Sequence, residues 1–199
     1  IDDDPSVRRA LERQLRTAGF RVEIFESAQQ YMARAPQAVI ACIVSDVRMP
    51  GMSGLDLQAS LAQSGRGLPM VFITGHGDIP TTVLAMKGGA VNFLPKPFAE
   101  REILAAVTEA LERSRAQFRA RGETEHLRNR FQSLTPRERE VLGLVARGLL
   151  NKVIADRLGV VESTVKIHRG RVMKKLGAAS LAELVRMSDD LDLATDEDP

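Results

Sequence analysis

The sequence has little cysteine, few aromatic residues and no long apolar run. It contains one cysteine, Cys42, no tryptophan and 4% aromatic residues. A single cysteine cannot form an internal disulfide, and Cys42 lies within an apolar run, so we expect a small core residue in a reducing compartment. No apolar run approaches the roughly 20 residues of a membrane-spanning helix, and the first residues have neither the basic nor the apolar region of an export signal. These features predict a cytoplasmic protein with no membrane partner.

The chain also lacks a large net charge, yet its charges are unevenly distributed. Residues 1–112 carry 11 basic and 13 acidic side chains, and residues 113–133 carry 6 and 2. Residues 134–188 carry 11 and 5, whereas residues 189–199 have six acidic side chains and no basic one. A mildly acidic half followed by a basic half is a weak indication of nucleic-acid binding by the second, because many basic faces are merely solvated.

Residues 1–112 alternate short apolar runs with helical patterns. Residues 21–25 alternate with period two, and residues 39–44, 70–73 and 91–94 are mostly continuous apolar runs, as is typical of strands buried on both faces. With a first strand at the start of the chain, this alternation predicts a doubly wound α/β domain with a five-stranded parallel sheet. Ligands of such sheets bind at the carboxyl ends of the strands.

The first strand is represented by Ile1 alone, although this architecture makes it a central strand. We therefore expect further apolar residues upstream in the natural protein. Helix starts are easier to place: Asp4 is an expected N-cap with Pro5 at the first helical position, and an apolar stripe follows until Gly19. The other expected N-caps of this half are Ser27, Ser53 and Asp78.

The rest of the chain is predicted to be helical. Residues 113–133 are rich in Arg, Glu and Gln and poor in apolar side chains, which indicates a helical linker. Residues 134–188 have no strand-like segment and are predicted to form four short helices, an all-α domain, and residues 189–199 to form a frayed acidic tail. In this domain Thr135 is the expected N-cap of the first helix, and Asn151 that of the second. The third helix begins at Glu162 or Ser163, continues to Leu176 and is basic.

Polar side chains stand where the predicted strands end. They are Asp2, Asp3 and Asp4 after the first strand, Asp46 after the third, Thr74 after the fourth and Lys96 after the fifth. Carboxylates at one edge repel one another unless a cation lies among them, and oxygen ligands suit Mg²⁺. Each residue alone has an ordinary alternative, such as a capping cluster, a turn or a surface position. Their joint placement favours a phosphoryl-transfer site, and since no Gly-rich nucleotide loop is present, the donor is not expected to be ATP bound by this chain.

These residues lie in four segments that resemble the receiver domain of response regulators, most closely the FixJ-like branch of the NarL/FixJ family. The segments are Asp2–Asp4, Ser45–Gly54, Ile73–Asp78 and Phe93–Phe98, in the order and spacing of that family. The resemblance implies a flavodoxin/CheY-like fold in which Asp46 is phosphorylated by a sensor histidine kinase. It implies these Mg²⁺ ligands: Asp3, Asp46, the backbone carbonyl of Arg48 and, directly or through water, Asp2.

The same resemblance implies how the signal leaves the site. Lys96 would contact the phosphoryl group beside a cis Lys96–Pro97 peptide, and Thr74 with Phe93 would form a switch pair that shifts the receiver toward homodimerisation. His76 is expected to be a solvated loop residue.

A short helix, a turn and a second, basic helix form a helix-turn-helix pattern, whose second helix can enter the major groove of double-stranded DNA. A helical dimerisation module with a solvated basic face is the alternative. Residues 151–159 followed by 162–169 resemble the LuxR-type helix-turn-helix of the same family. The DNA contacts that this implies are Thr164, Lys166, Ile167, Arg169, Arg171, Lys174 and Lys175. Gly170 departs from the family, which often has a longer side chain there, so water or DNA shape is expected to replace base readout. His168 is expected to pack or to contact phosphate.

The two halves together predict a response-regulator transcription factor and not an enzyme, apart from slow hydrolysis of its own aspartyl phosphate. It would bind DNA as a homodimer and act through the common form of RNA polymerase. Two alternatives stay open: a DNA-binding protein whose receiver is only a dimerisation scaffold, and a phosphoryl-relay protein without DNA recognition. The joint presence of Asp3, Asp46, Thr74 and Lys96 argues against the first, and the basic helix argues against the second.

Overall fold

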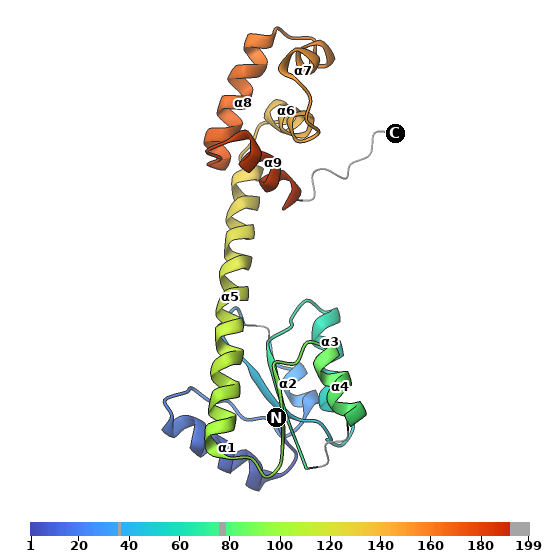
Figure 1. The fold of residues 1–199 in the computed structure, drawn as a ribbon, viewed down its shortest axis with the longest axis vertical. Helices are drawn as coiled ribbons and strands as arrows, with labels where there is room; N and C mark the ends of the chain where they lie inside the picture. The colour runs from blue at the N-terminus through green and yellow to red at the C-terminus, as the bar shows by residue number, and fades with distance from the viewer. Residues whose placement is uncertain (36, 76–78, 192–199) are drawn as a thin grey trace. The chain divides into compact units, whose positions relative to one another are not determined.

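The computed structural model describes residues 1–35, 37–75 and 79–191, which fall into two compact units, Ile1–Phe118 and Arg119–Pro199 (Figure 1). The expected N-cap Asp78, the loop residue His76 and residues 192–199 of the acidic tail lie outside the described residues. Every described helix is too short or too polar to cross a lipid bilayer.

A parallel sheet organises the first unit. Its strands are β1 (Ile43–Asp46), β2 (Met70–Thr74) and β3 (Asn92–Pro95), in the order β1-β2-β3. All five residues of β2 are buried, because β2 has a neighbour on each side and helices over both faces. Its side chains point alternately to the two faces, as the pleat of a strand requires.

Two apolar clusters cover the two faces of the sheet. On one face, Met70 and Phe72 of β2 pack with α2 (Ala28–Met32), α3 (Gly54–Gln63) and α4 (Ile79–Lys87). On the other face, Val71 and Ile73 pack with α1 (Pro5–Thr17) and with α5 (Glu100–Gln132). Helices on both faces of a parallel sheet confirm the predicted doubly wound α/β architecture.

The described residues form three strands, so the predicted count of five is not reproduced. Residues 21–25 are not a strand: among the described residues a single backbone hydrogen bond, from Asp2 N to Phe25 O at 3.3 Å, joins this segment to Asp2. Ile1 lies beside β1, since its nitrogen donates to Val44 O at 2.7 Å and its carbonyl accepts from Asp46 N at 2.8 Å. These bonds place residues 1–2 between β1 and residues 21–25, but two residues are too few for a ladder of hydrogen bonds.

The strand predicted at residues 39–44 begins later in the structure, where β1 starts at Ile43. Val39 and Ile40 are about half exposed, at 45% and 44%, and are not core residues. The Ala41 N–H donates to the Ser114 hydroxyl at 3.1 Å, and Ser114 is buried on α5. A side chain of a helix therefore occupies the place where a strand neighbour was expected.

Side-chain caps start most of the helices that the sequence predicted. Asp4 accepts from Ser6 N to start α1, Ser27 accepts from Gln30 N to start α2, and Ser53 starts α3 in a capping box with Asp56. These three predictions are confirmed.

The second unit is formed by the end of α5 and by α6 (Pro136–Ala146), α7 (Asn151–Leu158), α8 (Glu162–Leu176) and α9 (Leu181–Asp189). Its core contains the apolar residues of all four shorter helices, among them Leu142, Ile154, Val165 and Leu184. Thr135 caps α6 in a capping box with Glu138, as predicted. The helix α7 differs from the prediction, because its N-cap is Leu150 and makes no side-chain cap.

The helix α5 is 33 residues long and continues through the predicted linker. Its last turns contribute Leu127 and Phe131 to the apolar core of the second unit, whereas Phe118 is 44% exposed. The predicted linker is therefore helical in the structure, and its last turns are packed and not solvated all round.

Candidate functional site

Acidic side chains gather at the carboxyl edge of the sheet. Carboxylate oxygens of Asp2, Asp3 and Asp46 all lie within 4.8 Å of one another. Asp2 and Asp46 are 1% and 9% exposed, whereas Asp3 is exposed. Like charges this close repel unless a cation lies among them. An oxygen-only donor set with one solvent-facing member fits a hard divalent cation that keeps some of its waters.

Lys96 supplies a positive charge to the buried part of this cluster. Its Nζ donates to Asp2 Oδ2 at 2.8 Å and to Asp46 Oδ2 at 3.0 Å. Partial burial disfavours the charged ammonium, but the hydrogen bonds to Asp2 and Asp46 outweigh it and raise the pKa of Lys96. The Lys96–Pro97 peptide is cis, as predicted.

The turn after Asp46 fixes the position of its carboxylate. Arg48 N donates to Asp46 Oδ1 at 3.2 Å, and Gly54 N donates to Val47 O at 3.0 Å. Gly54 starts α3 directly against the strand: a Cβ on Gly54 would lie 2.3 Å from Asp46 O and 2.9 Å from Phe72 Cε1. A glycine is therefore needed here for close approach, and the approach holds the backbone of Asp46 in place.

The loop before α1 arranges the other two carboxylates. Asp4 N donates to Asp2 Oδ1 at 2.9 Å, while the Asp4 carboxylate caps α1 and the Ser6 N–H lowers the pKa of Asp4. Arg8 donates to the carbonyls of Asp2 and Asp3 at 2.6 and 2.9 Å. Sequence reasoning did not single out Arg8. Its place one turn into a helix that starts next to an acidic cluster is the signal that could have found it.

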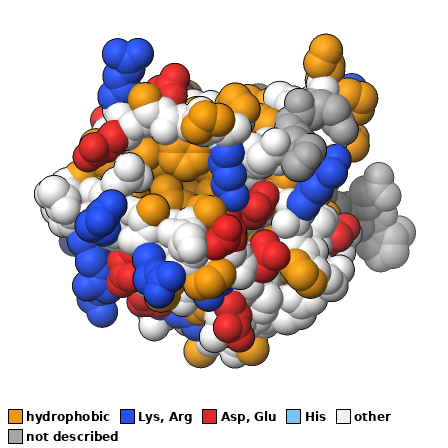
Figure 2. Space-filling view, turned by 90° about the horizontal axis from the view of Figure 1, so that it is seen from below, with side chains coloured by type: hydrophobic (Ala, Val, Ile, Leu, Met, Phe, Trp, Pro, Cys, Tyr) orange, Lys and Arg blue, Asp and Glu red, His pale blue; other side chains and the backbone are white. Residues whose placement is uncertain are grey.

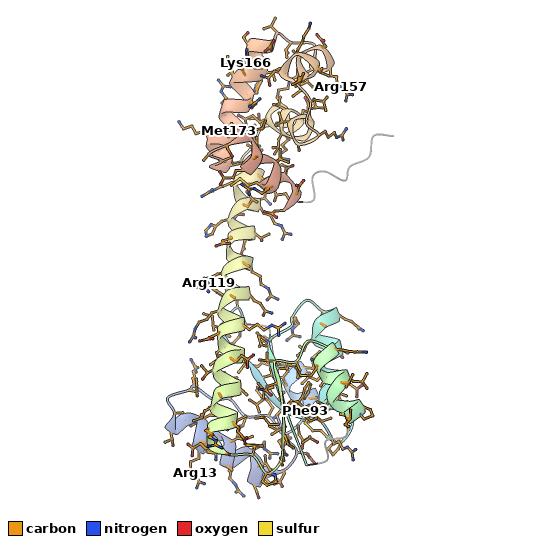
Figure 3. All side chains as sticks on the ribbon, viewed as in Figure 1. Arg13, Phe93, Arg119, Arg157, Lys166 and Met173 are labelled. Atoms are coloured by element: carbon orange, nitrogen blue, oxygen red, sulfur yellow. The ribbon has the colours of Figure 1, made fainter. Side chains whose placement is uncertain are left out.

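Thr74 and Phe93 lie on neighbouring strands near the cluster. Thr74 ends β2 and is 1% exposed, and its carbonyl accepts from Lys96 N at 2.6 Å. Phe93, which is labelled in Figure 3, is partly buried and lies across from Phe72 in the sheet register. The centroids of the two rings are 6.5 Å apart. The strand ends thus bring Asp2, Asp3, Asp46, Thr74 and Lys96 to one edge, and Phe93 stands three residues before Lys96.

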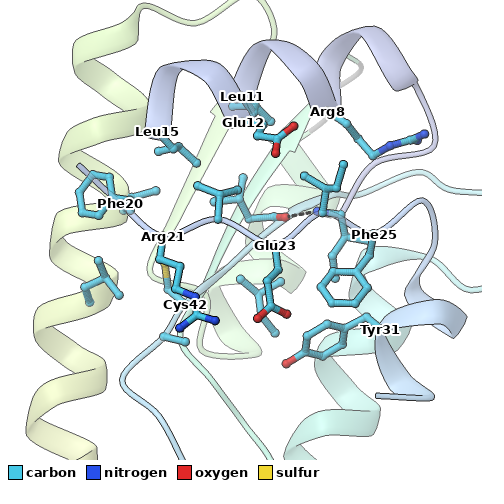
Figure 4. A pocket seen from close by; sticks show the side chains of 18 of the residues that line it. Arg8, Leu11, Glu12, Leu15, Phe20, Arg21, Glu23, Phe25, Tyr31 and Cys42 are labelled. Carbon is cyan, nitrogen blue, oxygen red and sulfur yellow. Dashed lines mark hydrogen bonds between the residues drawn. The ribbon is translucent and has the colours of Figure 1, made fainter. Parts of the chain in front are cut away.

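About 420 Å³ of open space lies between α1, residues 20–25, residues 40–44 and α5, next to Ile1, where the further apolar residues expected upstream of Ile1 would lie (Figure 4). Its lining is mainly apolar and includes Leu15, Phe20 and Cys42. Burial raises the pKa of the Cys42 thiol to about 11, so the thiol is protonated near neutral pH and packs as an apolar group.

On the face drawn in Figure 2, basic and acidic side chains lie next to one another with hydrophobic side chains between them.

The candidate nucleic-acid surface is α8. Its outward residues Lys166, Ile167, Arg171 and Lys174 are exposed, Ile167 by 55%, and Thr164 is half-buried. The Lys166 Nζ lies 3.0 Å from Glu162 Oε1, an exposed pair one turn apart. Figure 3 labels Lys166 on this helix. Exposed cations with an exposed apolar side chain are the combination that reads base edges and phosphates in a major groove.

Three other residues of α8 differ in their surroundings. Half-buried Arg169 donates to Asn151 Oδ1 at 3.2 Å, so Asn151 joins α7 to α8 and does not cap α7 as predicted. The Nδ1 of His168 is buried and has no hydrogen-bond partner among the described residues. A Cβ on Gly170 would meet no atom within 4 Å, so space does not require glycine there.

Lys175 points into the second unit. Its Nζ donates to Glu138 Oε2 at 2.7 Å and to Ser133 O at 3.1 Å. Glu138 is 2% exposed, and hydrogen bonds from Lys175 and from Thr135 N lower the pKa of Glu138 to about 2. This ion pair depends on contacts between α6 and α8, so no local sequence pattern could have predicted it.

Comparison with known families gives two matches that together cover most of the chain. Residues 1–108 match the response regulator receiver domain, and residues 132–188 match the bacterial regulatory proteins of the luxR family. The first match contains the acidic cluster and Lys96, and the second contains α6 to α9.

Individual relatives match both parts at once. Nodulation protein W of Bradyrhizobium diazoefficiens is 50% identical, and the alignment covers 98% of this chain and 86% of the relative. The transcriptional regulatory protein FixJ of Azorhizobium caulinodans is 44% identical over 94% of this chain and 89% of its own. The solved structure of the response regulator StyR has a TM-score of 0.78 at 49% identity and covers 95% of this chain and 96% of that one.

Proposed function

Because the chain belongs to the two-component response regulators that join a receiver domain to a LuxR-type helix-turn-helix domain, we propose that phosphorylation of Asp46 controls its binding to DNA. Members of this family are transcription regulators, which implies a histidine kinase and DNA as partners. The domain limits proposed are 1–112 for the receiver, 113–133 for the linker, 134–188 for the DNA-binding domain and 189–199 for the tail.

The observation that carries the proposal is the position of the Asp46 carboxylate beside Asp2, Asp3 and Lys96. In the proposed reaction a carboxylate oxygen of Asp46 forms a bond to phosphorus, and the P–N bond of a phosphohistidine in the kinase breaks. The imidazole leaves with the electron pair and takes up a proton. Lys96 is already hydrogen-bonded to Asp46, and a charge-assisted hydrogen bond to the phosphoryl group would replace that contact.

The acidic cluster fits Mg²⁺ by its donor chemistry. Asp3, Asp46 and the Arg48 carbonyl would hold the ion, with Asp2 bound directly or through water. When bound, Mg²⁺ neutralises negative charge on the transferred group. Arg8 would keep the carbonyls of Asp2 and Asp3 in position, and slow hydrolysis of the aspartyl phosphate would end the signal.

Thr74 and Phe93 are proposed as the residues that couple phosphorylation of Asp46 to dimerisation of the receiver. The buried Thr74 hydroxyl is on the strand next to Asp46, and a phosphoryl oxygen gives it a new acceptor. Such a ligand shifts a population between two arrangements by its extra contacts in one of them. We propose that the favoured arrangement dimerises, and that the second half-site contact then becomes intramolecular, which raises DNA affinity.

On DNA, Lys166 and Ile167 would face base edges, while Thr164, Arg169, Arg171 and Lys174 would position α8 on phosphates. The exposure of Lys166, Ile167, Arg171 and Lys174 supports these roles. The regulator would act in the cytoplasm through RNA polymerase. Lys175, which the family resemblance groups with the DNA contacts, donates hydrogen bonds to Glu138 and to Ser133 O within the protein.

The test compares three samples, two of the wild type and one of a variant, on one DNA. Binding fragments are first selected from a random-sequence pool with the wild type treated with a small acyl phosphate and Mg²⁺. Anisotropy titrations then compare the treated wild type, the untreated wild type and treated Asp46→Asn. The proposal expects tighter binding by the treated wild type alone. Equal affinity of all three samples would leave a DNA-binding protein whose receiver does not switch.

A further inference from the structure

The ends of α5 and α8 hold each other through basic side chains. Arg130, in the last turn of α5, donates from Nη1 to the carbonyl of Leu176, the last residue of α8, at 2.9 Å. Lys175, in the last turn of α8, donates to the carbonyl of Ser133, the residue after α5, at 3.1 Å. Each helix thus provides a cation for the carboxyl terminus of the other.

The physics of helix ends explains why this arrangement is stabilising. The last four carbonyls of a helix have no partner within the helix and carry partial negative charge. Lys and Arg side chains commonly satisfy such carbonyls within their own helix. Here each donor comes from the other helix, and the bonded residues are 46 and 42 positions apart in sequence. The two bonds therefore fix one helix end relative to the other.

Packing around the two bonds is consistent with a fixed junction. The Lys175 ammonium is also bound by buried Glu138, so it is held from two sides. Gly177, the C-cap of α8, has φ +76°, and a Cβ there would lie 2.8 Å from Arg130 Nη1. Phe131 packs on the apolar core, and the Arg139 guanidinium lies 5.2 Å from the centre of its ring.

We propose that Arg130 and Lys175 are positioning residues that set the orientation of the DNA-reading helix α8 against the end of α5, and that Lys175 is not a phosphate contact. The inference rests on the proposed function only in that α8 is taken as the DNA-reading helix. It differs from a general stabilising role because the two bonds fix the end of α8, and the orientation of α8 determines which of its side chains reach the DNA.

The neighbouring lysines of α8 give a matched test of Lys175. Affinity of the full chain for a random-sequence 30-base-pair duplex is measured over a range of salt concentrations, at a temperature where every variant is folded. Lys174→Met is expected to lower the slope of log affinity against log salt by about one, as the loss of one phosphate contact does. Lys175→Met is expected to keep the wild-type slope and to lower the melting temperature. A slope lowered by about one with an unchanged melting temperature would overturn the assignment of Lys175.

Arg130 is tested against Arg128, an exposed arginine of the same helix with no side-chain hydrogen bond among the described residues, whereas exposed Arg130 donates to Leu176 O. Arg130→Met is expected to weaken DNA binding about three- to tenfold at an unchanged salt slope, and Arg130→Lys to restore most of it. In the protein without DNA, Arg130→Met should speed hydrogen exchange of the amides at residues 173–177, and Arg128→Met should not. Unchanged exchange in Arg130→Met would refute the proposal. If the wild type fails to bind any duplex, the proposed function fails, while the exchange measurement still decides whether the junction exists.

Discussion

The close approach of Gly54 to the phosphoacceptor backbone can be tested with one methyl group. Gly54→Ala places a Cβ 2.3 Å from Asp46 O, 2.9 Å from Phe72 Cε1 and 3.1 Å from Ser45 Oγ. All three atoms belong to buried residues of the sheet, and the backbone oxygen of Asp46 and the Phe72 ring cannot move aside independently. Gly170→Ala is the matched control, because it adds the same methyl group to a helix where no atom lies within 4 Å.

The two variants are expected to change the free energy of unfolding in opposite directions. Overpacking in a well-packed region costs about 1–3 kcal/mol, and replacing a helical glycine by alanine returns about 0.5–1 kcal/mol. Because Gly54 is the first residue of α3, it gains little helix propensity, and Gly54→Ala should lower the free energy of unfolding of its unit by about 1–3 kcal/mol. Gly170→Ala should raise that of the other unit by about 0.5–1 kcal/mol, since it gains helix propensity without a clash.

Urea unfolding measures both changes. The single tyrosine, Tyr31, lies in the first unit, so its fluorescence follows the unit that carries Gly54. Far-ultraviolet circular dichroism follows both units and reports the effect of Gly170→Ala. A Gly54→Ala protein as stable as the wild type would show that the strand and α3 are looser than the structure has them. Treatment with an acyl phosphate should also phosphorylate this variant more slowly, because the shift of Asp46 disturbs the carboxylate cluster.

Three further predictions concern polar contacts. The pKa of Glu138 is about 2 in the folded protein, below its value of about 4.3 in an unfolded chain. Its ionisation therefore stabilises the fold above about pH 4.3, and this stability is lost as the pH falls toward 2. Between these pH values, the free energy of unfolding should fall more steeply for the wild type than for Glu138→Gln. Ser114→Ala removes the acceptor of the Ala41 N–H and should cost about 1–2 kcal/mol in urea unfolding, whereas an equal stability would mean that water replaces the hydroxyl. Saturating Mg²⁺ should raise the melting temperature of the wild type by several degrees and that of Asp46→Asn much less; an equal rise in both would place the ion elsewhere.

Local patterns in the sequence were sufficient for most of the helix starts and for the apolar clusters on the two faces of the sheet. Asp4, Ser53 and Thr135 are side-chain caps because the pattern of an N-cap is contained in four neighbouring residues. The buried run at 70–73 became the central strand β2 because an apolar run of that length is buried on both faces in any parallel sheet.

Features that depend on distant partners could not be predicted from such patterns. The strand predicted at residues 39–44 begins only at Ile43, and the Ala41 amide before it donates to the hydroxyl of Ser114, 73 residues away. The family resemblance groups Lys175 with the DNA contacts, and no local pattern indicates its hydrogen bond to buried Glu138, which lies on another helix. Asn151 has the residue type of a cap, but its side chain accepts from Arg169. In each case the hydrogen bond joins residues that lie far apart in the sequence.

The carboxylate cluster was predicted because strand ends of a parallel sheet meet at one edge, so residues 2, 46 and 96 come together despite their separation in sequence. The detail that Lys96 bridges Asp2 and Asp46 required the structure, as did the role of Arg8 beneath the loop.

The most direct test of the account is the mass of the protein after treatment with a small acyl phosphate and Mg²⁺, with sedimentation of the same sample. We predict a labile adduct of about 80 Da, one added phosphoryl group, on the wild type and none on Asp46→Asn, together with a shift toward the dimer in the wild type alone. An adduct that persists in Asp46→Asn, or an adduct on the wild type without any change in sedimentation or DNA affinity, would contradict the claim that Asp46 is the switch.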